Sequence, residues 1–323
     1  MKKRRYFYAF LAFIVVSLGT GGVLLSQNKG KRENTASPLR ITMILPHSDY
    51  GYWSIVGNGV MSAGKDLGVD VKVEIPQLNY NVDQMASLIE KNTAAKVDAI
   101  IVQGIEDDCY LSALKKAEEK GIQIIFVDTD IENFPNRLYI GTDNYSAGYL
   151  MGEKTAEATG QKANIIIMSG AEGYPNLEQR YKGFKDAIKS YSDMKILDLK
   201  YDYYDALQFS DSYYEAKRIY PEADTLVCIE GTAAQTLGRR NNNLKEIYDH
   251  ILAFDLNNEA VNAMKEGILH GVIVQQQEYM GYLAVEQAKQ KAEQGYYDAD
   301  VIFTDIYFIT LMDLDRENGY GKK

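Results

Sequence analysis

The segment Arg40–Trp53, RITMILPHSDYGYW, is the most informative part of this sequence. It predicts a buried apolar strand over Ile41–Leu45 that runs into a loop carrying Tyr50, Tyr52 and Trp53. The carboxyl ends of parallel strands open onto the crevice where α/β proteins bind ligands, so we expect these rings to face a cleft. Rings in that place form a platform for a flat ligand such as a sugar ring, although the same pair could simply seal the top of a core.

Apolar strand patterns alternate with amphipathic helix patterns along the rest of the chain. Further strands are predicted over Val69–Ile75, Ala99–Gln103, Ile124–Val127, Leu138–Gly141, Asn164–Met168, Met194–Tyr201, Thr225–Ile229, Ile251–Phe254, Gly271–Val274 and Val301–Leu311. This alternation is typical of parallel sheets with right-handed crossovers. Because the strands are too many for one ordinary sheet, we predict an α/β fold of two doubly wound parallel-sheet lobes.

The first 26 residues differ from the rest of the chain. Basic residues at positions 2–5 precede an uncharged run, Tyr6 to Ser26, that is long enough to span a bilayer. The run is longer than the apolar part of a cleaved signal, and no A-x-A-like site follows it closely. We therefore expect residues 1–26 to be retained as a single-pass membrane anchor, residues 27–38 to form a polar spacer, and the remainder to lie outside the cytoplasm.

Composition and motifs exclude several functions. The chain has 323 residues and a net charge of −10, which argues against nucleic acid as a partner. The sequence contains neither a phosphate-binding P-loop nor a nucleophile elbow, and Gly57 and Gly59 lack the third glycine of a dinucleotide motif, so we expect them in helix packing. His47, His250 and His270 stand far apart without companion ligands. We therefore expect no metal site, no cofactor and no enzymatic activity.

Two further groups of residues have alternative interpretations. Cys109 and Cys228 could in principle form a disulfide, but each lies in or near a predicted buried strand end, so we expect two unpaired, buried thiols. Asp128 and Asp130 follow the strand Ile124–Val127 directly, and such a pair could hold a divalent cation in a metal-dependent transferase. The accompanying bases and phosphate loops are not visible in the sequence, so the transferase is a remote alternative. A carboxylate at a strand end can equally accept hydrogen bonds from two hydroxyl groups.

From about Leu39 to Leu311 the chain resembles the type I periplasmic binding proteins of the ribose, galactose and xylose group. The motifs that carry the resemblance, in the expected order, are Tyr52-Trp53, VDTD at 127–130, IGTDNYSAGYLMG at 140–152, EQRYKGF at 178–184, AFDLNNEAVNAMKEG at 253–267 and VIVQQQEYMGYLAVE at 272–286. The resemblance implies an N-terminal lobe of residues 39–142 plus 276–304 and a C-terminal lobe of residues 143–275 plus 305–323. It also implies three crossings, near 142–143, 275–276 and 304–305, and a ligand held between the lobes by hinge closure.

The resemblance also implies the ligand-binding residues. They are Tyr52, Trp53, Gln103, Asp128, Arg180, Thr232, Asp255 and Gln275. Two departures concern specificity, because Thr129 stands where the family commonly has arginine and Thr232 where it commonly has asparagine. We expect Tyr203 and Tyr204, in the loop after Met194–Tyr201, to help fill the space left by the lost guanidinium. The ligand is then expected to be a monosaccharide, a deoxy or amino sugar, or another small polar molecule.

Two functions remain open for such a binding protein. It could deliver its ligand to the permease of an ABC sugar transporter. A retained anchor suits a protein docked on a membrane partner, so the chain could instead sense a sugar for a two-component histidine kinase. Repressors of this fold carry an N-terminal helix-turn-helix, whereas here the membrane segment occupies that place.

Overall fold

The computed structural model describes residues 38–47, 51–239 and 244–314. The predicted anchor, the spacer up to residue 37 and Tyr50 lie outside the described residues. Within the described ranges no helix is both long and apolar enough to cross a membrane. The anchor over residues 1–26 therefore stays a prediction.

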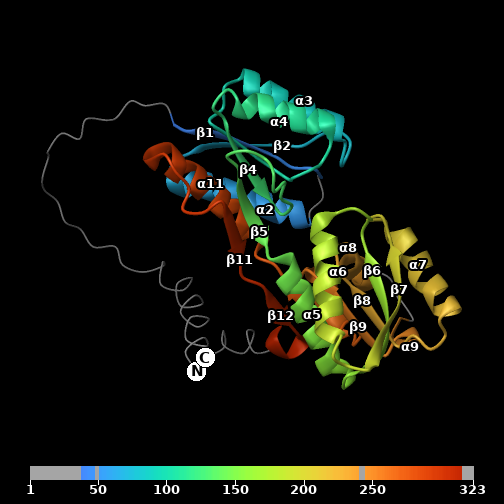
Figure 1. The fold of residues 1–323 in the computed structure, drawn as a ribbon. Helices are drawn as coiled ribbons and strands as arrows, with labels where there is room; N and C mark the ends of the chain where they lie inside the picture. Colours follow the sequence, from blue (N-terminus) through green and yellow to red (C-terminus); the bar gives the residue numbers. More distant parts are fainter. Residues whose placement is uncertain (1–37, 48–50, 240–243, 315–323) are drawn as a thin grey trace, which may run out of the picture. The chain divides into compact units, whose positions relative to one another are not determined.

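Two six-stranded sheets organise the chain (Figure 1). The first has the order β11-β5-β4-β3-β1-β2, and all its strands run parallel. Its strands are β1 (Arg40–Ile44), β2 (Asp70–Glu74), β3 (Ala99–Val102), β4 (Gln123–Val127), β5 (Leu138–Thr142) and β11 (Val301–Thr304). The predicted strands of this lobe are confirmed to within one residue at their ends, except Val301–Leu311, of which β11 is only the first part.

The second sheet has the order β12-β10-β9-β8-β6-β7. Its strands are β6 (Lys162–Ser169), β7 (Asp193–Tyr201), β8 (Thr225–Cys228), β9 (His250–Phe254), β10 (Gly271–Val274) and β12 (Tyr307–Ile309). All pairings are parallel except that of β12, which lies antiparallel to β10. The prediction of an α/β fold with two parallel-sheet lobes is confirmed.

Helices cover both faces of each sheet, as a doubly wound fold requires. In the first lobe they are α2 (Tyr52–Leu67) and α11 (Gln277–Gln294) on one face and α3 (Val82–Ala94) and α4 (Asp108–Glu118) on the other. In the second lobe they are α5 (Asn144–Thr159) and α6 (Pro175–Ile188) on one face and α7 (Ala206–Ile219), α8 (Thr232–Arg239), α9 (Leu244–Ile247) and α10 (Asn258–Lys265) on the other. The short helix α9 was not predicted.

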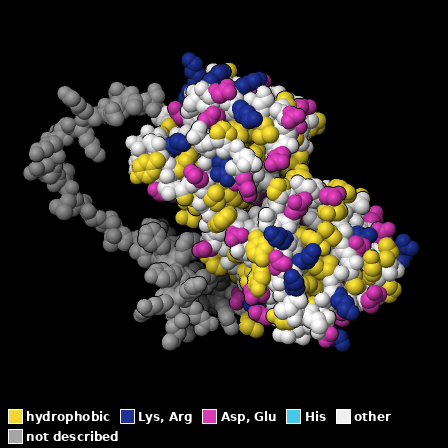
Figure 2. Space-filling model, viewed as in Figure 1, with side chains coloured by type: hydrophobic (Ala, Val, Ile, Leu, Met, Phe, Trp, Pro, Cys, Tyr) yellow, Lys and Arg dark blue, Asp and Glu magenta, His cyan; other side chains and the backbone are white. Residues whose placement is uncertain are grey.

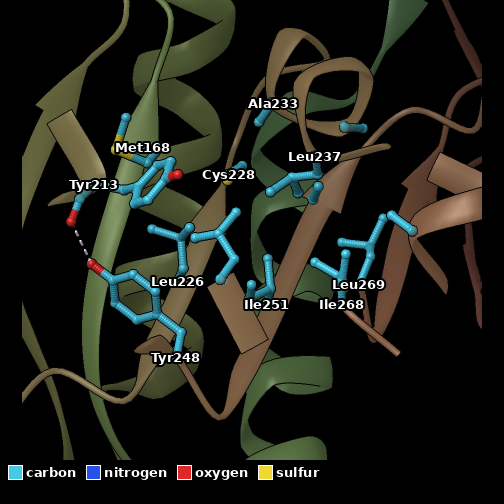
Figure 3. Packing of buried hydrophobic residues seen from close by; sticks show 14 of the residues in the cluster. Met168, Tyr213, Leu226, Cys228, Ala233, Leu237, Tyr248, Ile251, Ile268 and Leu269 are labelled. Carbon is cyan, nitrogen blue, oxygen red and sulfur yellow. Dashed lines mark hydrogen bonds between the residues drawn. The ribbon is translucent and has the colours of Figure 1, made fainter. Parts of the chain in front are cut away.

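The core of the second lobe shows how these layers interlock (Figure 3). Leu226 and Cys228 project from β8 into a fully buried cluster with Leu237 of α8. The hydroxyl of buried Tyr248 donates a hydrogen bond to the backbone oxygen of Tyr213 at 3.0 Å, so its polar end is satisfied within the apolar cluster. The other cysteine departs from the prediction, because Cys109 is exposed in the first turn of α4; both thiols are free.

Glycines allow two helix pairs to pack closely. A Cβ on Gly59 of α2 would lie 1.8 Å from the backbone oxygen of Glu278 in α11, which confirms that this glycine serves helix packing. The equivalent pair in the second lobe is α5 and α6, where a Cβ on Gly148 would lie 1.9 Å from the backbone oxygen of Arg180. The close contact between α5 and α6 therefore positions the backbone that carries Arg180.

The chain passes between the two sheets three times, after β5, after β10 and after β11. The single strand predicted over Val301–Leu311 is wrong in this respect. Its first part pairs with β5 as β11, whereas its second part pairs with β10 as β12. Thr304 and Asp305 interrupt the apolar residues of this segment, and the partner strands on either side of Asp305 belong to different sheets.

Candidate functional site

A cleft of about 1170 Å³ is lined by residues of both lobes within the compact unit Pro38–Lys323. Eight of the nine predicted ligand-binding residues line it, namely Tyr52, Trp53, Gln103, Asp128, Arg180, Tyr204, Asp255 and Gln275. Thr232, the ninth, is the first residue of α8, and its side chain lies outside the described part of the chain. The cleft is large enough for a small organic ligand.

Asp128 directly follows β4 and has a φ of +73°. Its carboxylate accepts three hydrogen bonds: from the Tyr52 hydroxyl at 2.6 Å, from Nε2 of Gln103 at 3.2 Å and from the Thr129 hydroxyl at 2.8 Å. Thr129 thus turns toward the neighbouring carboxylate and is not among the residues that line the cleft. The hydrogen bonds hold Asp128 in one orientation at the end of its strand.

Asp255 directly follows β9 and has a φ of +67°. Its Oδ1 accepts hydrogen bonds from Nε2 of Gln275 at 2.9 Å and from Nε2 of Gln277 at 3.0 Å. Burial raises the pKa of Asp255 to about 6, in opposition to the nearby charge of Arg180 and the hydrogen bond from Gln275. A Cβ at Gly231 would lie 2.5 Å from Oδ2, so the glycine leaves room beside that oxygen.

Arg180 is buried with 3% of its surface exposed, so it is not a surface charge. Its Nε donates to Oδ1 of Asn144 at 2.8 Å, its Nη1 to the backbone oxygen of Ile229 at 3.0 Å and its Nη2 to Oε1 of Gln275 at 2.9 Å. The guanidinium also lies over the Phe254 ring at 4.2 Å. The guanidinium of Arg180 therefore fixes the orientation of the Gln275 side chain, and Gln275 in turn fixes that of the Asp255 carboxylate.

Tyr52 and Trp53 meet edge to face, with ring centroids 5.3 Å apart and an angle of 76°. Trp53 is 4% exposed and belongs to the core cluster under α2, yet both residues line the cleft. The pair thus both seals the core and forms part of the cleft wall. Burial and the charge of Asp128 raise the pKa of the Tyr52 hydroxyl, which keeps it a hydrogen-bond donor.

A stack of tyrosines links the two lobes at the cleft. Tyr80, from the loop after β2, stacks on Tyr204, from the loop after β7, at 6.0 Å and 18°. Tyr174 packs its ring against Tyr204 edge to face at 6.0 Å. Tyr80 and Tyr204 have positive φ angles of 55° and 60°, which tyrosine seldom adopts. Tyr80 was not among the predicted ligand-binding residues, because it lies in a loop that does not directly follow a predicted strand.

Two carboxyl groups were also missed. Glu230 follows the predicted strand Thr225–Ile229, is 4% exposed, lines the cleft and accepts a hydrogen bond from the Ala233 backbone N–H at 3.0 Å. Asp202 is fully buried, and burial together with the charge of Glu230 raises its pKa. The strand-end position that pointed to Asp128 was present for Glu230 as well.

The Asp128-x-Asp130 motif does not form a paired carboxylate site. Oδ2 of Asp130 accepts a hydrogen bond from Nη2 of Arg137 at 2.6 Å, and Asp130 does not line the cleft. Over the residues that the structure describes, no group of three or more His, Cys, Asp or Glu side chains is placed to hold a metal ion. The geometry thus gives no support to the transferase alternative.

Comparisons with known proteins agree with this architecture. A family model described as "Periplasmic binding protein domain" matches residues 41–295. The "D-apiose import binding protein" of Paraburkholderia graminis is 22% identical over 256 residues, which cover 79% of this chain and 81% of that protein.

Solved structures of known proteins have the same fold. The structure of GanP, a glucose-galactose binding protein from Geobacillus stearothermophilus, superposes with a TM-score of 0.79 at 26% identity and covers 86% of this chain and 99% of that one. A chain of the "XylFII-LytSN complex" has a TM-score of 0.74 at 27% identity and covers 86% of this chain and 100% of that one.

Proposed function

Because the chain belongs to the periplasmic binding protein family, we propose that its cleft binds a monosaccharide or a related small polyol by closure of the two lobes. Members of this family are non-enzymatic solute-binding proteins, and the chain is one of them. The relatives described above carry the names of sugars, D-apiose in one case and glucose and galactose in another.

The observation that carries the proposal is the placement of Asp128 and Asp255 in one cleft. Each carboxylate enters from the end of a central strand, one in each lobe, beside the rings of Tyr52 and Trp53. Adjacent hydroxyl groups of a sugar can both donate to one carboxylate, and the C–H groups of its ring pack on aromatic surfaces. A ligand that engages both carboxylates favours the closed arrangement of the lobes.

Hydrogen bonds connect this site to the crossings between the lobes. Oε1 of Gln275, at the second crossing, accepts hydrogen bonds from the Thr142 hydroxyl at 2.7 Å and from Arg180 at 2.9 Å. Its Nε2 donates to Asp255. A ligand that moves Asp255 or changes its protonation therefore also acts on Gln275, whose side chain connects the first crossing with the second. This connection supports a coupling of ligand binding to hinge closure.

The single tryptophan of the chain offers a direct test. Trp53 lines the cleft, so titration of the full chain with pentoses and hexoses should change its fluorescence in a saturable manner. Asp255→Asn should shift the titration to higher sugar concentration. A fluorescence that no sugar changes, in a protein with a cooperative unfolding transition, would contradict sugar binding at this site.

We further propose that the bound form delivers its ligand to the permease of an ABC transporter at the extracytoplasmic face of the membrane, with the predicted segment 1–26 as its anchor. The second candidate is a sensor that signals through a histidine kinase. The observation that favours it is the similarity to a chain solved as part of the XylFII-LytSN complex. Affinity purification of the tagged full chain from membranes, with and without sugar, distinguishes the two by recovery of a permease or of a kinase.

A further inference from the structure

Two buried carboxyl groups of the second lobe are hydrogen-bonded to each other. On the face shown in Figure 2, acidic side chains lie at the surface among lysine and arginine side chains. Asp202 and Glu230 differ, because they are 0% and 4% exposed. The carboxyl of Asp202 is hydrogen-bonded to that of Glu230. No N–H or hydroxyl group of the described residues donates to Oδ2 of Asp202, which is also buried.

The second sheet brings the two carboxyl groups together. Asp202 directly follows β7, Glu230 lies two residues beyond the end of β8, and both strands flank β6. The backbone N–H of Asp202 donates to the backbone oxygen of Ser169 in β6 at 3.0 Å. The backbone N–H of Ile229 donates to that of Met168 in β6 at 2.9 Å. Backbone hydrogen bonds thus fix both loops to the end of β6, one on each side of it, and hold the two carboxyl groups against each other.

A hydrogen bond between two carboxyl groups requires a proton. Ionised carboxylates only accept hydrogen bonds, so one of the two groups must be protonated to act as the donor. Glu230 accepts from the Ala233 backbone N–H at 3.0 Å, in the first turn of α8, where the helix dipole favours a negative charge. Burial and the charge of Glu230 raise the pKa of Asp202. The proton therefore belongs to Asp202.

Asp202 also holds the loop that carries Tyr204. Its Oδ1 accepts a hydrogen bond from the backbone N–H of Tyr204 at 2.9 Å. Tyr203 and Tyr204 have positive φ angles of 51° and 60°, so this loop depends on contacts that keep an unfavourable backbone in place. The ring of Tyr204 lies against Gly170, where a Cβ would come within 2.3 Å of it, and stacks on Tyr80 of the first lobe. Asp202 thus acts on the aromatic contact between the lobes through the loop that it binds.

We propose that Asp202 is a positioning residue of the cleft, which keeps its proton, donates it in a hydrogen bond to Glu230 and thereby holds Tyr204 in place. The inference rests on the proposed function, because it concerns the cleft that binds the sugar. Loss of the proton leaves two adjacent buried carboxylates, and their repulsion displaces the loop and separates Tyr204 from Tyr80. Sugar affinity should therefore fall as the pH rises into the alkaline range.

Other ionisable groups near this pair do not produce the same effect. Burial raises the pKa of the Cys228 thiol and that of the Tyr204 hydroxyl, so both groups stay neutral at a pH at which Asp202 can lose its proton. Asp255, with a pKa raised to about 6, is already ionised in the alkaline range. Arg180 keeps its charge throughout. An alkaline change in affinity can therefore be assigned to Asp202.

The first measurement is calorimetric titration of the purified full chain with D-glucose, D-galactose, D-ribose and D-xylose from about pH 7 to about pH 10. The affinity of the native chain should fall roughly two- to tenfold over this range, which is the contribution of one aromatic pair. Asp202→Asn carries an amide that can donate to Glu230 and accept from the Tyr204 N–H, so it should bind like the native chain at about pH 7 and lose the alkaline fall. Asp205→Asn changes an exposed carboxylate of the same loop and should keep the native pH profile.

The second measurement needs no sugar. In the unfolded chain Asp202 ionises above its ordinary value of 3.8, whereas in the folded chain its pKa is raised. Its contribution to stability is thus fully present below about pH 4 and is lost as the pH rises through the folded pKa. In urea unfolding of the empty protein, the unfolding free energy of the native chain should therefore fall relative to that of Asp202→Asn as the pH rises from about 5.

The outcomes separate this inference from the proposed function. If a sugar binds but its affinity shows no alkaline fall, or if Asp202→Asn keeps the fall, the inference is overturned and sugar binding stands. Should Asp202→Asn fail to fold, Glu230→Gln removes the charge that keeps the proton on Asp202, and an alkaline fall that persists there overturns the inference as well. If no sugar of the panel binds to the folded chain, the proposed function fails, whereas the urea measurement still shows whether Asp202 keeps its proton.

Discussion

Asp128 and Asp255 occupy equivalent positions in the two lobes. Each is the first residue after a central strand, and each has a left-handed backbone, with φ of +73° and +67°. The backbone N–H of Asp128 donates to the backbone oxygen of Ile140 in β5, and that of Asp255 donates to the backbone oxygen of Ile273 in β10, at 3.2 and 2.8 Å. The same conformation at the end of a strand thus brings one carboxylate to the cleft from each lobe.

Truncation of the cleft should weaken binding strongly. Asp255→Ala and Trp53→Ala are each expected to raise the dissociation constant more than tenfold, or about 1.4 kcal/mol, because one removes a hydrogen-bond acceptor and the other a ring of the cleft wall. Asp186→Ala removes an exposed carboxylate from α6 and serves as the control. Calorimetric titration measures all three, and an unchanged affinity in both cleft variants would refute the site.

Binding should weaken in acid. Burial raises the pKa of Asp255 from 3.8 to about 6, so in the empty protein this group gains a proton as the pH falls through about 6. A ligand that donates to the carboxylate prefers the ionised form, so affinity should fall by up to about tenfold per pH unit below that point. Titrations from about pH 5 to about pH 8 test this, and Asp255→Asn should flatten the curve.

The raised pKa of Asp255 also makes the unfolding free energy depend on pH. The folded pKa of Asp255 exceeds the unfolded value of 3.8, so its contribution to the unfolding free energy of the empty protein is fully present below about pH 4 and is lost as the pH rises through about 6. Urea unfolding of the empty protein and of Asp255→Asn measures the difference. A contribution that grows with rising pH would contradict a raised pKa.

The tyrosine stack should slow ligand release. Tyr80 and Tyr204 come from different lobes, and an aromatic pair contributes about 0.5–1.5 kcal/mol beyond its buried area. Tyr80→Ala is expected to speed dissociation by roughly two- to tenfold, whereas Tyr80→Phe keeps the stacked ring and should speed it less. Stopped-flow Trp53 fluorescence gives the rates, and equal rates for Tyr80→Ala and the native chain would exclude such a role.

The close approach of α2 and α11 should tolerate no side chain at Gly59. Gly59→Ala places a Cβ against the backbone of Glu278 and is expected to lower the unfolding free energy by about 1–3 kcal/mol or more. Gly57→Ala lies in the same helix, but its Cβ would meet only a side-chain carbon of Leu45 at 3.4 Å, so this variant should be neutral or slightly stabilising. Similar losses in the two variants would argue against the packing explanation.

Strand ends were the most informative feature of the sequence. Apolar runs bounded by turns predicted most strands of both sheets, and the position after a central strand pointed to Asp128, whereas Asp255 was implied by the resemblance to the periplasmic binding proteins. The same rule applies to Glu230, which directly follows the predicted strand Thr225–Ile229 but was not among the predicted ligand-binding residues.

Other features depend on contacts that the sequence does not display. Tyr80 lies in a loop without periodicity, and its importance arises only where it meets Tyr204 of the other lobe. The hydroxyl of Thr129 turns to Asp128 instead of replacing a guanidinium in the cleft. The resemblance implied a crossing near 304–305, but the split of one predicted strand into β11 and β12 depends on which neighbouring strand pairs with each half.

We propose that the two lobes bind a monosaccharide between Asp128 and Asp255. Thermal unfolding of the full chain with a panel of pentoses, hexoses and their deoxy and amino derivatives tests it most directly. A ligand at one hundred times its dissociation constant should stabilise the protein by about 2.7 kcal/mol, and Asp255→Asn should lose most of that gain. Cooperative unfolding at the same temperature without sugar and with every sugar of the panel would contradict this proposal.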